Sequence, residues 1–259
     1  MFSNNKYLLK QLVKRDVLLR YKGSALGMLW SFVIPILMLV VYTFVFSVVF
    51  EARWNVQSDN HLQFALIIFS GMTIFNFFSE AINRSPSLMV NNSNYVKKVI
   101  FPLHLLPLST VLSAFVHMII SFVILLAGVA VLGDGVHLSL LYTPIVLVPI
   151  FLFTLGVSWI LASLGTYIRD ISYLINVLTS ALMFLSPIFY PIDSVPEDLR
   201  VLYYINPVSY TVEDMRSIVI WGTAPNFQWL LIGSAIGAVV SLIGYYWFNK
   251  TRSGFADVL

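Results

Sequence analysis

A carboxylate and a guanidinium lie four residues apart near the end of an apolar stretch, residues 62–82. Glu80 precedes Arg84 there, and no other charged residue occurs between residues 60 and 96. Helical spacing of four places both side chains on one face, and charges in lipid usually pair with an opposite charge. We therefore expect an intramembrane ion pair. The alternative is a proton relay through Glu80, for which the sequence offers no second buried carboxylate.

The residue types that metal, nucleotide or thiol chemistry needs are missing or badly spaced. The chain has no cysteine, and its four histidines lack metal-ligand spacing, so no metal site is expected. No glycine is followed by lysine, so the phosphate loop GxxxxGK[ST] is absent and this chain is expected to bind no cofactor. Five acids between residues 193 and 214 are candidate acid–base groups of a membrane enzyme, but capping and helix-dipole roles explain them more simply. These acids are Asp193, Glu197, Asp198, Glu213 and Asp214.

Composition places the chain in a membrane. Of its 259 residues, 59% are hydrophobic and 10% are charged, whereas a soluble domain carries about 25% charged residues. A span needs roughly 20 apolar residues in a helix, because lipid offers no partner to backbone N–H and C=O groups. We expect an all-α membrane protein of one domain, residues 1–259, in which an interfacial helix (1–29) precedes a six-span bundle (30–259). The expected spans are 30–50, 62–82, 105–132, 140–167, 171–190 and 228–248.

Basic residues are unequally divided between the two faces that these spans create. The N-terminus, the second and fourth connections and the C-terminus hold 12 of the 15 lysines and arginines, with three acids. The opposite connections hold three basic residues and eight acids. Positive charge is retained on the cytoplasmic side, so both termini are expected inside. The basic excess follows membrane topology and does not indicate nucleic-acid binding.

An amphipathic pattern runs through the first 22 residues. Leu8, Leu12 and Val13 fall on one side of a helical wheel, and Lys10 and Lys14 fall on the other. The pattern predicts a helix lying along the cytoplasmic headgroups. Two roles stay open for this helix, a lipid anchor or a collar that gates the cytoplasmic entrance of a transport path.

The connection between the second and third spans, residues 86–107, is too polar to cross a membrane and too apolar for a solvated linker. We expect a short cytoplasmic coupling helix that ends before Pro102. Its lysines alone would serve as membrane anchors, but the aromatic residues beside them favour a protein partner. The candidate docking residues are Asn94, Tyr95, Lys97, Lys98 and Phe101.

The long connection after residue 190 contains two helix-start signals. Ser194 and Glu197 have the spacing of a capping box, and Asn206-Pro207 suits an N-cap followed by a first-turn proline. The apolar residues that follow these signals favour two short external helices that re-enter the outer leaflet against the bundle.

Aromatic residues gather in the first, second and fifth expected spans. Packing and interface-belt roles explain most of them. A subset is expected to line a path on which sugar rings slide, because aromatic faces give apolar contact without a deep hydrogen-bonding well. The channel-lining candidates are Tyr42, Phe46, Phe184, Phe189 and Tyr190.

Several short motifs, taken in order and with this topology, resemble the permease subunits of ATP-binding-cassette polysaccharide exporters of the O-antigen and teichoic-acid type. The resemblance covers essentially the whole chain. It rests on residues 20–31, RYKGSALGMLWS, with Pro35 in the first span, and on residues 97–102, KKVIFP. Further matches are Arg169-Asp170, residues 186–190, SPIFY, and Asn206-Pro207.

The resemblance implies a homodimer around one central channel in the bacterial cytoplasmic membrane. It also implies two copies of a cytoplasmic ATPase that bind ATP and Mg²⁺ and dock around residues 95–101, so this chain itself is not an enzyme. The implied cargo is a polysaccharide on undecaprenyl diphosphate, with a teichoic acid or capsule polymer as the alternative. An ion-gradient-driven transporter and an enzyme of lipid-linked sugars are the competing classes. The residues that the resemblance places at the cargo entrance are Arg20, Tyr21, Lys22 and Trp30.

Overall fold

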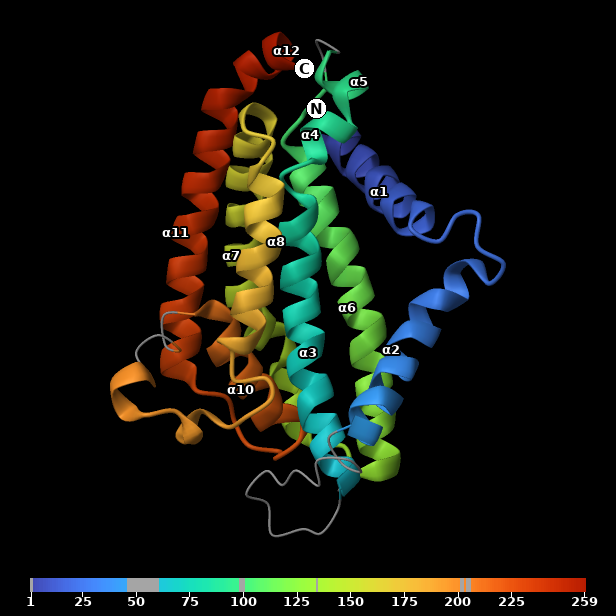
Figure 1. Cartoon of the computed structure of the whole chain (residues 1–259), viewed down its shortest axis with the longest axis vertical. Helices are drawn as coiled ribbons and strands as arrows, with labels where there is room; N and C mark the ends of the chain where they lie inside the picture. The colour runs from blue at the N-terminus through green and yellow to red at the C-terminus, as the bar shows by residue number, and fades with distance from the viewer. Residues whose placement is uncertain (1, 46–60, 98–100, 134, 201–202, 204–205) are drawn as a thin grey trace.

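The described part of the chain is helical throughout. The computed structural model describes residues 2–45, 61–97, 101–133, 135–200, 203 and 206–259, and these ranges contain no strand. The long helices run side by side along the long axis, with α1 and α2 splayed to one side (Figure 1). The α-helices are α1 Phe2–Leu19, α2 Trp30–Tyr42, α3 His61–Arg84, α4 Leu88–Asn91, α5 Ser93–Val96, α6 Leu105–Leu132, α7 Thr143–Tyr167, α8 Ile171–Phe184, α10 Pro207–Val219, α11 Phe227–Thr251 and α12 Phe255–Val258.

Among the described residues, five helices are long and apolar enough to cross a membrane, which makes this a multi-pass helical membrane protein. Each corresponds to one of the predicted spans. The first predicted span, 30–50, continues past residue 45 into a stretch that lies outside the described residues. The five candidate spans cover Gly27–Val45, Gln63–Arg84, Leu105–Leu132, Leu138–Tyr167 and Phe227–Val258.

The remaining predicted span, 171–190, corresponds to the shorter helix α8. This helix has 14 residues and ends at Phe184, so its length is about 21 Å. The chain then turns at Ser186-Pro187, where proline has no N–H with which to continue the helical hydrogen bonding. α8 stands beside α3 and α7. A sixth crossing therefore stays a prediction.

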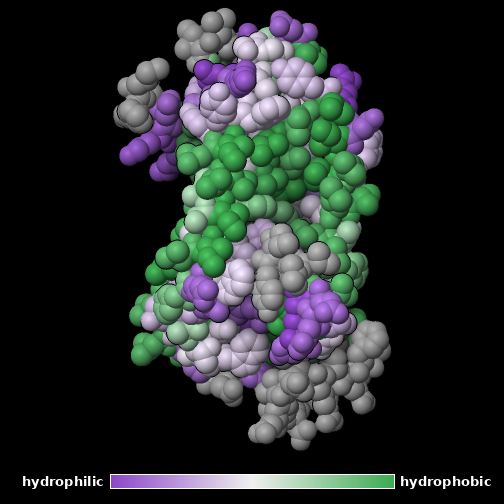
Figure 2. Space-filling model, turned by 90° about the vertical axis from the view of Figure 1, so that its left-hand side faces the viewer, coloured by the Kyte–Doolittle hydropathy of each residue, from purple (hydrophilic) through white to green (hydrophobic). Residues whose placement is uncertain are grey.

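The surface carries a hydrophobic belt between two more hydrophilic ends, as Figure 2 shows for one side of the molecule. Exposed apolar side chains on α8 include Val177, and on α11 they include Leu231 and Leu242, each at least two-thirds exposed. Contiguous exposure of this kind is expected where lipid, and not water, surrounds the helices.

α3 is the central helix of the bundle. It contacts α6, α7, α8 and α10, and 83% of its apolar 18-residue segment is buried within the protein. α7 and α11 form the most extensive helix pair. A Cβ added to Gly156 of α7 would overlap the α11 backbone, and one on Gly244 of α11 would overlap Gly156 itself. Glycine permits this backbone contact because it has no side chain.

α1 joins the bundle at the end where both termini lie (Figure 1). Leu12 and Val17 are buried, and α1 contacts α6, while Lys10 and Lys14 remain exposed. The helix ends at Leu19, well before the expected boundary at residue 29, because a turn with Gly23 at a φ of 90° intervenes. The amphipathic prediction for the N-terminal segment thus holds over a shorter range.

The second connection contains two four-residue helices, α4 and α5, where one coupling helix was expected. Asn92 lies between them with non-helical dihedral angles, and its side-chain amide donates to the Leu88 carbonyl at 2.9 Å. Asparagine side chains compete in this way with helix continuation. The segment lies at the same end of the molecule as the termini (Figure 1).

α10 follows the long connection at the opposite end of the bundle (Figure 1). The predicted Asn206 cap is confirmed, because its side chain accepts from the Val208 N–H at 3.0 Å and Pro207 opens the helix. The predicted capping box is wrong: Ser194 closes a separate 3-10 turn, and the short helix at Glu197 is preceded by proline with no side-chain cap.

Arg216 fixes α10 to its neighbours. Its fully buried guanidinium donates to the carbonyls of Pro187 at 2.6 Å and Ile188 at 2.7 Å, and to the Ile67 carbonyl of α3 at 3.3 Å. Glu213, one turn earlier, accepts from the same group at 3.0 Å. One side chain thus ties α10 to the turn after α8 and to the central helix.

Candidate functional site

A cavity of about 890 Å³ opens between the end of α1, α2, α3 and α6. The first half of α3 lines it with apolar side chains such as Phe69 and Met72, whereas the second half contributes Asn76, Glu80 and Arg84. The second half of α3 lies toward the end that carries α4, α5 and both termini (Figure 1). The cavity is therefore polar toward that end and more apolar farther along the bundle.

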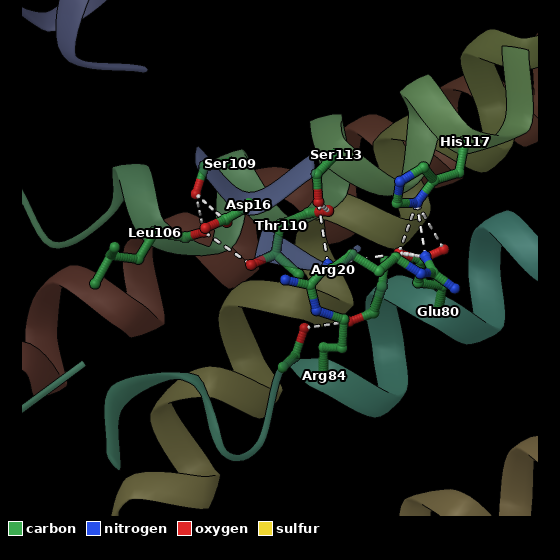
Figure 3. Close-up of polar contacts among 11 residues, drawn as sticks. Asp16, Arg20, Glu80, Arg84, Leu106, Ser109, Thr110, Ser113 and His117 are labelled. Atoms are coloured by element: carbon green, nitrogen blue, oxygen red, sulfur yellow. Dashed lines mark hydrogen bonds and ion pairs between the residues drawn. The ribbon is translucent and has the colours of Figure 1, made fainter. Parts of the chain in front are cut away.

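Glu80 is the centre of a charged cluster in this cavity (Figure 3). Its carboxylate contacts the Arg20 guanidinium, and its Oε1 lies 3.0 Å from His117 Nδ1 and 3.4 Å from Arg84 Nη1. The Glu80 and His117 side chains are 15% and 11% exposed, whereas those of Arg20 and Arg84 are 44% and 38% exposed. Two guanidinium groups that are open to solvent therefore share one shielded carboxylate.

Matching spacings on α3 and α6 build the cluster. Glu80 and Arg84 are four residues apart, as are Ser113 and His117, so each pair lies on one face of its helix. His117 meets Glu80, and Arg84 Nη1 donates to Ser113 Oγ at 3.1 Å. Glu80 and Arg84 thus lie at ion-pair distance, but the sequence reasoning missed both Ser113 and His117. The available signal was His117, the one ionisable residue of the span 105–132, with Ser113 four residues before it.

His117 Nδ1 contacts two groups that require different protonation states of this nitrogen. It is 2.7 Å from Arg20 Nη1, which only donates hydrogen bonds, and 3.0 Å from Glu80 Oε1, which accepts them when ionised. A protonated Nδ1 satisfies Glu80 and opposes Arg20, whereas an unprotonated Nδ1 accepts from Arg20 and faces the carboxylate lone pairs. No single protonation state satisfies both contacts, so the cluster holds competing interactions.

Tyr21 covers the cluster from the turn between α1 and α2. Its ring meets His117 edge-on with centroids 5.9 Å apart, and the Arg20 guanidinium lies 5.9 Å from the same ring centroid. Burial raises the pKa of Tyr21, so its hydroxyl stays protonated near neutral pH and remains a donor. The turn therefore supplies one cation and one neutral donor to the cavity.

Arg15 connects α1 to α5. Its Nη1 donates to the Tyr95 hydroxyl at 2.9 Å, and its Nη2 lies 2.9 Å from Asp16 Oδ1. The Tyr95 ring in turn stacks on Phe101, with centroids 4.5 Å apart. α1 therefore contacts the second connection through Arg15, and the turn that follows α1 carries Arg20 into the cavity.

Similarity to known proteins decides the family of this chain. Residues 7–220 match the family described as ABC-2 type transporter. The chain belongs to the ABC-2 transporter family. Membership places it among transport subunits.

Curated relatives in this family align over most of the chain. An O-antigen export system permease of Klebsiella pneumoniae is 28% identical over 253 residues, which cover 97% of this chain and 95% of the relative. The corresponding permease of Myxococcus xanthus is 26% identical over 252 residues, covering 96% and 94%. A polysialic acid transport protein of Escherichia coli is 22% identical over 227 residues, covering 85% and 84%.

The structure separates the candidate docking residues of this ABC-2 chain into two groups. Asn94 and Lys97 are exposed on the second connection. Tyr95 and Phe101 are partly buried and contact each other, and Tyr95 also contacts α1. Lys98 lies outside the described residues.

The candidate residues of the cargo entrance also lie in different places. Arg20 and Tyr21 line the large cavity, but Lys22 lines a smaller one of about 350 Å³ formed by the turn itself. Trp30, at the start of α2, is partly buried and lines neither cavity.

Only Tyr42 among the described channel candidates lines the large cavity. Phe184 and Phe189 lie at and after the end of α8, with ring centroids 6.1 Å apart. The Tyr190 hydroxyl donates to the Phe184 carbonyl at 2.6 Å and also lies 2.6 Å from the Tyr203 hydroxyl. These three residues form a separate aromatic group, and Phe46 lies outside the described residues.

Proposed function

We propose that this chain is the membrane-spanning subunit of an exporter that moves lipid-linked polysaccharide across the bacterial cytoplasmic membrane. The observation that carries the proposal is similarity over nearly the whole chain to two O-antigen export permeases. A capsule-type polymer is the alternative cargo, supported by the similarity to a polysialic acid transport protein. Membership in an ABC family favours ATP as the energy source over an ion gradient.

The proposed topology is six spans with both termini in the cytoplasm. It is supported by the common end at which the two termini lie (Figure 1) and by the excess of lysine and arginine in the segments assigned to that side. In this topology α8 is the fifth span, and α10 is a re-entrant helix on the outer side. The single domain of residues 1–259 includes a continuous hydrophobic core from Leu12 of α1 to Phe255 of α12.

Two copies of the chain are proposed to enclose the path. α2 supports this arrangement, because only 6% of the apolar segment that contains it, within Gly27–Val45, is buried inside one chain. Its exposed residues include Phe32, Ile36 and Val40, which need either lipid or a second copy as cover. The cavity beside α2 would then face the space between the two subunits.

A separate ATPase is proposed to supply the energy, with two copies docking on the second connections of the two chains. The sequence has no phosphate-binding loop, so ATP and Mg²⁺ would bind that partner. Asn94 and Lys97, together with Lys98, would present polar contacts, while Tyr95 and Phe101 would shape the surface beneath them. Movement of α5 would reach α1 through the Tyr95–Arg15 contact and so displace Arg20 in the cavity.

Replacing both Tyr95 and Phe101 by alanine is expected to weaken co-purification of the ATPase by about tenfold or more, because the stacked pair shapes the docking segment. Tyr95→Phe removes only the hydroxyl that accepts from Arg15. This variant should therefore retain the ATPase but transport less cargo per ATP hydrolysed. Unchanged co-purification of the double variant would refute the docking assignment.

The cargo entrance is proposed at the α1–α2 turn, where Arg20, Tyr21 and Lys22 would lie beside the lipid diphosphate and Trp30 near the membrane interface. Arginine forms paired hydrogen bonds with phosphate oxygens, which suits the open position of Arg20. Tyr42 and Phe46 would continue the sugar path from there. Phe184, Phe189 and Tyr190 would contact the polymer nearer the outer side.

Deletion of the gene in its native host tests the proposed function. The expected result is that polymer is still made and attached to its lipid but accumulates inside the cytoplasmic membrane and no longer reaches the cell surface. A plasmid copy should restore surface polymer. Normal surface polysaccharide in a strain that lacks the protein would contradict the proposal.

A further inference from the structure

The residues that line the cavity have an excess of positive charge, because one of their two carboxylates is paired with an arginine outside the lining. Asp16 and Glu80 are the carboxylates among its lining residues, and Arg20 and Arg84 are the guanidiniums. Asp16 pairs with Arg15, which does not line the cavity. Glu80 is therefore the carboxylate left to balance two arginines, with His117 as a third nitrogen partner.

The three partners of Glu80 surround one small acceptor in the way that an anion site surrounds its ligand. The two guanidiniums and His117 Nδ1 all approach the same carboxylate oxygen, Glu80 Oε1. A phosphate group would offer these three partners several oxygens instead of one. His117 Nδ1 cannot satisfy Glu80 and Arg20 together, as described above. A ligand with more acceptor atoms would relieve this competition.

We infer that Glu80 occupies the place of a ligand phosphate, and that Arg20, Arg84 and His117 form a binding site for the phosphate end of a lipid amphiphile. The inference rests on the proposed function, which supplies a cargo on a phosphorylated lipid. It adds the α3 and α6 residues to the site and gives Glu80 the role of an internal competitor.

The shape and lining of the cavity favour an amphiphile over a free ion. Beyond the charged cluster, the lining continues with Ile34 and Met38 of α2, Phe69 and Met72 of α3, and Met118 of α6. Apolar surface of this kind suits an isoprenoid chain, and a volume of about 890 Å³ leaves room for more than a phosphate. The phosphate would bind toward the α4–α5 end and the chain would extend away from it.

Competition by Glu80 makes the binding conditional. A phosphate that takes Arg20 must displace the carboxylate or bind beside it against like-charge repulsion. Because Arg20 is on the α1–α2 turn, a shift of α1 separates Arg20 from Glu80 and exposes the cation. Glu80 thereby offsets one of the two guanidinium charges of the unloaded site and limits retention of the ligand.

The test is equilibrium binding of radiolabelled farnesyl diphosphate to the full-length chain in lipid nanodiscs, without ATPase. Farnesol and inorganic pyrophosphate are the competitors that separate the apolar and anionic contributions. The variants are Glu80→Gln and Arg84→Gln, with Glu197→Gln as the control. Glu197 is an exposed carboxylate on the connection that precedes α10, and it does not line the cavity.

Glu80→Gln should bind farnesyl diphosphate about tenfold more tightly than the wild type, and Arg84→Gln about tenfold more weakly, as expected for one charge contact. Glu197→Gln should match the wild type. Unchanged or weaker binding by Glu80→Gln would overturn the inference. The inference would also be overturned if farnesol competed as effectively as unlabelled farnesyl diphosphate. If inorganic pyrophosphate competed as effectively as unlabelled farnesyl diphosphate, the site would bind free phosphate, which contradicts the lipid assignment.

If Glu80→Gln does not yield folded protein, Glu80→Asp replaces it. The shorter carboxylate reaches Arg20 less well, so binding should again tighten, and unchanged affinity would count against the inference. The assay contains neither ATPase nor polymer, so it is independent of export. Surface polymer lost on gene deletion together with unchanged Glu80→Gln binding would reject the inference and leave the exporter standing. Tighter binding with normal surface polymer would reject only the exporter.

Discussion

Arg216→Met is expected to lower the free energy of unfolding by about 3–5 kcal/mol, the range typical of breaking a buried charged contact from one side. The substitution leaves the carbonyls of Pro187 and Ile188, both of which accept from Arg216, without this donor. Glu213 also loses its cationic partner. Titration with sodium dodecyl sulfate in mixed micelles measures the loss.

Arg169→Met is the matched control for that measurement, because Arg169 is exposed at the connection between α7 and α8. Its effect should stay within about 0.5 kcal/mol, as for ordinary surface substitutions. Equal stabilities of the two variants would contradict the structural role assigned to Arg216. A large loss in Arg216→Met alone would establish that α10 is held to the bundle through this side chain.

Arg20→Gln is expected to reduce surface polymer by about tenfold or more while insertion and ATPase binding remain normal, since it removes the more exposed of the two guanidiniums that line the cavity. Arg20→Lys keeps the charge but loses the paired donors, so export should fall to an intermediate level. Surface polymer in the complemented deletion strain is the measured quantity.

Lys14→Gln provides the control for Arg20→Gln, because Lys14 is an exposed cation on α1. Export in this control should equal that of the wild type. A defect confined to assembly in Arg20→Gln would make Arg20 a structural anchor between α1 and α3. A similar export defect in both variants would point to the general charge of α1 instead.

Long apolar runs made most of the bundle predictable. The span 105–132 matches α6 at both ends, and 140–167 matches α7 with the 3-10 turn that precedes it. The predicted span 171–190 is longer than α8, because the apolar run continues through Ser186-Pro187 although the helix ends at Phe184. Hydropathy detects the run, but the proline and the turn decide where hydrogen bonding stops.

The charged cluster was only half predictable. The spacing of Glu80 and Arg84 is a local property of one helix, so it predicted their pairing. The approach of Arg20 and His117 to the same carboxylate depends on how α1 and α6 are placed against α3, which no local pattern contains. For the same reason, the contact between Arg15 and Tyr95 joins two segments that the sequence reasoning treated separately.

The most direct measurement is transport of a fluorescent oligosaccharide on undecaprenyl diphosphate in sealed proteoliposomes that contain the chain with or without its ATPase. Movement from the ATPase-facing leaflet to the other should require ATP and both proteins, and it should be strongly reduced by Arg20→Gln. Transport at the full rate by this chain alone, without ATPase and nucleotide, would contradict an exporter whose membrane subunit depends on a separate motor.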